Sequence, residues 1–129
     1  MKKKLSVARS AAAVFGALAL TVGLSACVSA AAAEPSVTVG PEAILIDVRT
    51  AAEFAEGHLE GATQLDFNGG DVAAAIPTLD PNAEYYVYCR SGNRSGQAIA
   101  LMQQAGFTNL TNLGSVEQAS SATGISIVR

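Results

Sequence analysis

The chain has 129 residues, enough for one domain and an export segment. Four of its eight basic residues lie in the first ten positions, whereas all eleven acidic residues lie after position 33. Without the N-terminal segment, four arginines stand against eleven acidic side chains, a net charge of −7 with no lysine. Such a domain has no basic patch of useful size, which excludes nucleic-acid binding.

Residues 1–26 have the pattern of a lipoprotein signal peptide. A basic start precedes an apolar stretch over residues 11–24, which is too short and too rich in small residues for a transmembrane helix. The stretch ends in Leu24-Ser-Ala-Cys27, which resembles the lipobox of bacterial lipoproteins. That resemblance implies lipid on the Cys27 sulfur and cleavage before it. Cleavage within residues 29–33, which releases a soluble protein, and an uncleaved anchor are the alternatives.

Each alternative exports the domain, and lipid would hold it on the outer face of the bacterial cytoplasmic membrane or in the cell envelope. Residues 27–36 are rich in alanine, and we expect them to form a lipid-anchored tether to a domain over residues 37–129. If lipid occupies Cys27, Cys89 is left as a single thiol. An exported domain gains little from such a thiol unless its reactivity is used.

Short segments of continuous apolar or alternating character in the domain predict five strands. They cover residues 37–39, 43–48, 62–65, 85–88 and 107–113. The second run is continuously apolar, as expected for a central parallel strand covered on both faces. Asp47 interrupts it near its carboxyl end, and Arg49 follows. We expect this carboxylate to be either buried and paired or part of a site.

Helical patterns separate these strands. Thr50 and Glu53 have the spacing of a capping box, which predicts a short helix to about residue 56. Weaker helical patterns cover residues 72–79 and 116–120, and the rest of the C-terminal tail is poorly patterned. The alternation predicts a small α/β domain with a mainly parallel sheet. The active crevice of such a sheet lies outside the carboxyl ends of its strands.

The stretch from Tyr85 to Ser95 predicts a strand, a tight loop and a helix in succession. The strand delivers Cys89 into a turn that ends at Arg94, and the helical pattern runs from Ser95 to Gly106. Loop amides and the positive end of the helix dipole converge there, so the junction can bind an anion and stabilise a thiolate. Arginines gathered beside it favour an anionic ligand, although they could instead pair with nearby carboxylates.

Four motifs in this order resemble those of the rhodanese (sulfurtransferase) family. They are Ile46-Asp-Val-Arg-Thr50 with Glu53-Phe54, Gly57-His-Leu-Glu-Gly-Ala62, Tyr88-Cys-Arg-Ser-Gly-Asn-Arg-Ser95 and Ala105-Gly-Phe107. The resemblance implies an α/β fold with a central, mostly parallel five-stranded sheet flanked by helices. The chain departs from the family after Leu113, where Gly114-Ser115 replaces Gly-Gly, and it contains no tryptophan.

The resemblance implies a sulfurtransferase in which Cys89 is the nucleophile. Its thiolate would take sulfur from thiosulfate or a similar sulfane donor as a persulfide and pass it to a thiol or cyanide acceptor. Asp47 and Arg49 would brace the loop from the neighbouring strand, and a thioredoxin-like protein is a reasonable thiol acceptor. No metal or organic cofactor is implied. The donor and the persulfide would be held by the loop residues Arg90, Ser91, Gly92, Asn93, Arg94 and Ser95.

Other interpretations of these residues stay open at this point. Cysteine-dependent phosphatases have a Cys-x5-Arg loop, whereas four residues separate Cys89 from Arg94 here, which favours sulfur over phosphate. His58, the only histidine, could act as a base for Cys89, but we favour a structural bond to backbone. The alternative to an enzyme is a non-catalytic persulfide carrier or docking module in the cell envelope.

Overall fold

A computed structural model describes residues 34–129, and the expected signal peptide and Cys27 lie outside the described residues. A parallel sheet of four strands forms its centre, in the order β3-β1-β4-β5. The strands are β1 (Ile44–Asp47), β3 (Thr63–Gln64), β4 (Tyr85–Cys89) and β5 (Leu110–Ser115). A separate antiparallel pair joins β2 (His58–Leu59) to β6 (Ile127–Val128).

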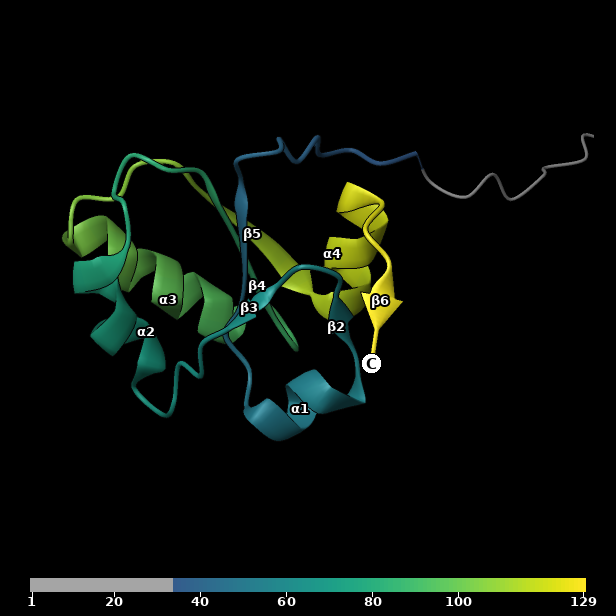
Figure 1. The fold of residues 1–129 in the computed structure, drawn as a ribbon, viewed down its shortest axis with the longest axis horizontal. Coiled ribbons are helices and arrows are strands. Elements are labelled where there is room, and N and C mark those ends of the chain that lie inside the picture. Colours follow the sequence, from purple (N-terminus) through teal and green to yellow (C-terminus); the bar gives the residue numbers. More distant parts are fainter. Residues whose placement is uncertain (1–33) are drawn as a thin grey trace, which may run out of the picture. The chain divides into compact units, whose positions relative to one another are not determined.

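Helices cover both faces of the sheet, with α2 and α3 on one side and α4 on the other (Figure 1). They are α1 (Ala51–Glu56), α2 (Asp71–Ala75), α3 (Asn93–Gln104) and α4 (Val116–Thr123), and a 3-10 turn (Ile76–Thr78) follows α2. No helix among residues 34–129 is long and apolar enough to span a membrane.

The central strand β4 connects two hydrophobic clusters because its side chains alternate between the two faces of the sheet. Tyr85, Val87 and Cys89 face the cluster that includes α2 and α3. Tyr86 and Tyr88 face the cluster that includes α4. Every residue of β4 is buried, as expected for a parallel strand covered on both sides. The thiol at its end therefore belongs to the α3 side of the sheet.

The expected fold class is confirmed, but the expectation of a fifth strand is wrong for the described residues. Residues 37–39 form no strand. The Val37 amide instead donates to the Ala122 carbonyl of α4 at 2.8 Å, and Val37 and Val39 pack on the α4 side of the core. Pro35 and Pro41 flank this segment and carry no amide hydrogen, which limits ladder pairing.

The predicted capping box of α1 is confirmed and also ties α1 to α3. The Glu53 amide donates to the Thr50 hydroxyl at 3.2 Å, and the Thr50 amide donates to the Glu53 carboxylate at 3.0 Å. Arg94 in the first turn of α3 donates to both Glu53 oxygens, each at 2.9 Å. The Arg94 hydrogen bond outweighs burial and, with the Thr50 bonds, lowers the pKa of Glu53 to about 2.

Glu53→Gln tests the ion pair between α1 and α3. Glutamine keeps the capping-box geometry, so the substitution removes mainly the charge. We expect the free energy of unfolding at pH 7 to fall by about 1 kcal/mol. Because the folded pKa is lowered from 4.5 to about 2, this stability is present above the ordinary pKa and is lost as pH falls through the folded one.

Urea denaturation at pH 7 and at about pH 2 would measure this difference. The matched control is Glu60→Gln, because Glu60 is exposed and forms no ion pair within residues 34–129. A deficit for Glu53→Gln that is the same at both pH values would contradict the role of the charge.

Candidate active site

Cys89 ends β4, and its side chain is buried beneath the loop that follows. Its sulfur accepts a hydrogen bond from the Gly92 amide at 2.9 Å and one from the Ser95 hydroxyl at 3.5 Å. Gly92 has a φ of 90°, and a Cβ there would lie 3.3 Å from the Gly114 Cα. Both the positive φ and this close approach favour glycine. The loop therefore turns its amides back onto the sulfur.

The surroundings of Cys89 favour its thiolate. Burial raises the pKa of the thiol, but hydrogen bonds from the Ser95 hydroxyl and from the amides of Ser95, Ser91 and Gly92 outweigh it. The pKa of Cys89 is therefore lower than its ordinary value. Helix α3 begins at Asn93, so the positive end of its dipole also lies near the sulfur and favours the thiolate. These are the conditions under which a cysteine becomes a nucleophile near neutral pH.

The two loop arginines have different surroundings. The Arg94 guanidinium is held by the Glu53 carboxylate, so it fastens the start of α3 to α1. Arg90 is exposed and forms no hydrogen bond or ion pair within residues 34–129. The side chain of Asn93 accepts a hydrogen bond from Gln97 at 2.6 Å and so stays on the surface of α3. Of the two loop arginines, Arg90 is the one that is free to meet an anion.

Asp47 and Arg49 form a buried ion pair at the carboxyl end of β1, beside β4. The Arg49 guanidinium donates to both Asp47 oxygens, and the terminal nitrogen also donates to the Gly57 carbonyl at 2.6 Å. Its charge lies 5.8 Å from the centre of the Tyr88 ring. Within the described residues, no hydrogen bond joins the pair to the 89–95 loop. The pair instead fixes the chain after α1, which leads into β2.

Asn112 of β5 is a further residue at the loop, and the sequence did not reveal it. Its carbonyl oxygen accepts from the Ser95 hydroxyl at 2.8 Å and from the Gly114 amide at 3.0 Å. Its side-chain nitrogen donates to the Gly92 carbonyl at 3.1 Å. Asn112 thus binds the two residues that donate to the sulfur. A shift in the register between β4 and β5 accompanies this arrangement, and no local pattern indicates it.

His58 has the structural role that we favoured from the sequence. Its Nδ1 donates to the Phe54 carbonyl at 2.8 Å, and its ring stacks on the Phe54 ring with centroids 3.6 Å apart. The imidazole therefore packs against α1. Among residues 34–129, no group of three histidine, cysteine or acidic side chains is placed to hold a metal ion.

Ser95→Ala tests whether the hydroxyl stabilises the Cys89 thiolate. We expect the pKa of Cys89 to rise and its alkylation at pH 7 to slow roughly tenfold, as for loss of a hydrogen bond to a charged group. The measurement is the pH dependence of alkylation in a Cys27→Ser background, so that only Cys89 reacts. Ser91→Ala is the control, because it removes a hydroxyl but keeps the amide that faces the sulfur. Equal effects of the two substitutions would contradict this role.

Comparison with known proteins gives the same family throughout. The model of the rhodanese-like domain matches residues 30–121. A sulfurtransferase of Allochromatium vinosum is 35% identical over 56% of this chain and 65% of its own length, slightly less than two thirds. The putative sulfurtransferase YtwF of Bacillus subtilis is 36% identical over 62% of this chain and 76% of its own length. The thiosulfate sulfurtransferase PspE of Escherichia coli is 32% identical over 56% of this chain and 69% of its own length.

Solved structures agree with the sequence relatives. A rhodanese with anions from E. coli superposes with a TM-score of 0.58 at 28% identity, covering 67% of this chain and 98% of its own. The rhodanese-like domain of the Alr3790 protein from Anabaena gives a TM-score of 0.59 at 27% identity, covering 69% of this chain and 89% of its own. Because the family model spans most of the chain and includes the cysteine loop, this chain belongs to the rhodanese-like domain family.

Proposed function

We propose that the protein is a thiosulfate sulfurtransferase, or uses a similar sulfane donor, with Cys89 as the sulfur-carrying nucleophile. The observation that carries this proposal is the Cys89 sulfur at the end of β4, which accepts hydrogen bonds from the Gly92 amide and the Ser95 hydroxyl. These donors stabilise a negative sulfur, either as thiolate or as persulfide. The sulfurtransferase relatives support the same class of reaction.

The reaction we propose has two half-reactions. In the first, the Cys89 thiolate attacks the outer sulfur of thiosulfate, the sulfur–sulfur bond of the donor breaks, and sulfite leaves with the electron pair. In the second, an acceptor thiol or cyanide attacks the outer sulfur of the persulfide, and the Cys89 thiolate is regenerated. The free, exposed Arg90 would attract the anionic donor. The solved E. coli rhodanese contains anions, which is consistent with an anion site in this fold.

Intact-mass spectrometry tests the first half-reaction directly. Incubation with thiosulfate should add one sulfur atom to a Cys27→Ser chain, and cyanide should remove it. Cys89→Ser in the same background should gain no sulfur, which assigns the adduct to Cys89. Absence of an adduct with thiosulfate and with several other sulfane donors would refute the proposal. Loading followed by no more than one transfer would instead identify a persulfide carrier.

The cellular context that we propose follows from Leu24-Ser-Ala-Cys27, which lies outside the described residues. Lipid on Cys27 would hold the domain, through residues 27–36, at the outer face of the cytoplasmic membrane or in the cell envelope. A thioredoxin-like protein there would be one acceptor of the sulfur. In an oxidising, exported location the thiol would need a dedicated reductant or acceptor.

Fractionation of cells that express the full chain tests the lipid anchor. We expect the unsubstituted protein in the membrane fraction and Cys27→Ser either in the soluble fraction or unprocessed with its signal peptide. Cys89→Ser is the matched control, because it removes the other cysteine and should leave the protein in the membrane fraction. A processed Cys27→Ser protein that stays with the membrane would contradict lipid attachment at Cys27.

A further inference from the structure

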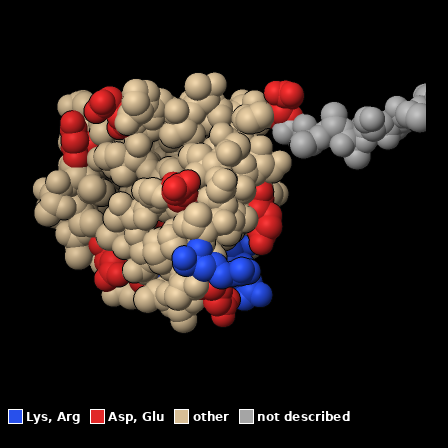
Figure 2. Space-filling view, turned by 45° about the vertical axis from the view of Figure 1, so that its right-hand side comes forward, with Lys and Arg blue, Asp and Glu red and all other residues tan. Residues whose placement is uncertain are grey.

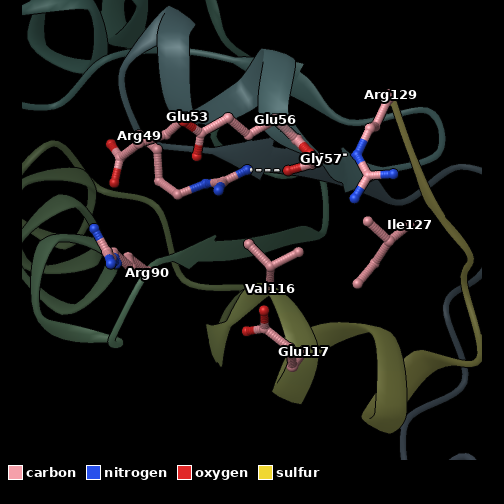
Figure 3. A pocket seen from close by; sticks show the side chains of 9 residues that line it. All are labelled: Arg49, Glu53, Glu56, Gly57, Arg90, Val116, Glu117, Ile127 and Arg129. Carbon is pink, nitrogen blue, oxygen red and sulfur yellow. Dashed lines mark hydrogen bonds between the residues drawn. The ribbon is translucent and has the colours of Figure 1, made fainter.

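Most of the arginines in the described part of the chain line a pocket of about 350 Å³ (Figure 3). Its volume falls within the usual range for small-molecule sites. Figure 2 shows the basic side chains of one face lying together, next to acidic ones. The pocket is lined by Arg49, Glu53, Glu56, Gly57, Arg90, Val116, Glu117, Ile127 and Arg129. Three of the four arginines of residues 34–129 are therefore at one place.

Several of these charges have no partner among the described residues. The ion pairs within residues 34–129 are Arg49–Asp47 and Arg94–Glu53. Arg129 donates from Nε to the Glu56 carbonyl at 2.8 Å, which leaves its terminal nitrogens open. In Figure 3 the Arg129 guanidinium lies beside Glu56 and Gly57 and the Glu117 carboxylate lies at the start of α4, with the Val116 and Ile127 side chains between them. Opposite charges thus share one pocket without forming a salt bridge to each other.

The balance of charge in the pocket selects among ligand classes. Three arginines and three glutamates line it, so it is neutral overall within a domain of strong negative charge. A simple anion would meet the open Glu117 carboxylate, and a simple cation would meet Arg129. A zwitterion matches both. The apolar wall formed by Val116 and the 44% exposed Ile127 suits the short carbon backbone and side chain of a small zwitterion.

We propose that this pocket binds the zwitterionic end of an amino-acid thiol, of which free cysteine is the simplest, and so selects the sulfur acceptor. The acceptor carboxylate binds Arg129 and its ammonium group binds Glu117. Arg90 lines the pocket and directly follows Cys89, so the pocket adjoins the cysteine loop, and the acceptor thiol extends past Arg90 to reach the sulfur, because Cys89 is not itself a lining residue. This inference rests on the proposed persulfide chemistry of Cys89.

The transfer step balances without an added oxidant or reductant. The acceptor thiol loses its proton to the medium, and its sulfur attacks the outer sulfur of the Cys89 persulfide. A new sulfur–sulfur bond forms on the acceptor, the bond to Cys89 breaks, and the Cys89 thiolate leaves with the electron pair. The product is the persulfide of the amino acid.

Three thiols distinguish the contribution of the ligand's carboxylate from that of its ammonium group. Cysteine carries both charges, cysteamine lacks the carboxylate, and 3-mercaptopropionate lacks the ammonium group. After loading from thiosulfate and removal of the donor, the rate of sulfur loss from the protein is followed by intact mass at several thiol concentrations, with rates expressed per thiolate. We expect kcat/KM for cysteine to exceed that for each analogue by about fivefold, the effect of one such charge pair.

Single substitutions assign each charge. Arg129→Gln should remove the advantage of cysteine over cysteamine, and Glu117→Gln should remove its advantage over 3-mercaptopropionate. Glu60→Gln, an exposed residue outside the pocket, should leave both ratios unchanged. Equal rates for the three thiols, or ratios that survive both pocket substitutions, would overturn the inference. Failure of the unsubstituted protein to load sulfur would count against the proposed function, whereas a loaded protein with no preference for cysteine contradicts the pocket alone.

Discussion

The hydrogen bond from the Gly92 amide to the Cys89 sulfur is the interaction on which the site depends. A thiol buried at the end of a strand would have a raised pKa if no donor faced it. Here the positive φ of Gly92 lets the loop turn so that its amides already face the sulfur before any reaction begins. Because these donors are fixed by the backbone, they cost no reorganisation when negative charge forms on the sulfur. Burial and nucleophilicity are therefore compatible at this position.

The loop keeps this shape because it is held from two sides. Arg94 and Glu53 fasten the start of α3 to α1, and the Glu53 carboxylate also accepts from the Thr50 amide in the capping box of α1. On the other side, Asn112 binds both the Ser95 hydroxyl and the Gly92 carbonyl. The Ser95 hydroxyl has one proton and two acceptors, Asn112 and the Cys89 sulfur. It can therefore turn toward the sulfur when charge develops there, without any movement of the backbone.

The sequence predicted the parts of this arrangement that depend on local spacing. The capping box of Thr50 and Glu53, the central strand and the loop after Cys89 all lie within short segments, so their patterns were readable. Contacts between residues far apart in the sequence could not be predicted in this way. Arg94 and Glu53 are 41 positions apart, and Asn112 and Gly92 are 20 positions apart. The expected strand at residues 37–39 is not formed, because the two valines of this segment also suit packing on the α4 side of the core.

The arginines of the domain show why a count of charges cannot locate a ligand site. Arg49 and Arg94 carry half of the positive charge of residues 34–129, but each is committed to a carboxylate. The net charge of the domain repels anions at long range, and salt screens that repulsion beyond about 8 Å. Recognition of the proposed donor and acceptor would then rest on short contacts with the loop amides, Arg90 and Arg129. Selectivity in this domain therefore depends on which charges stay unpaired, and those flank the cysteine loop and the adjoining pocket.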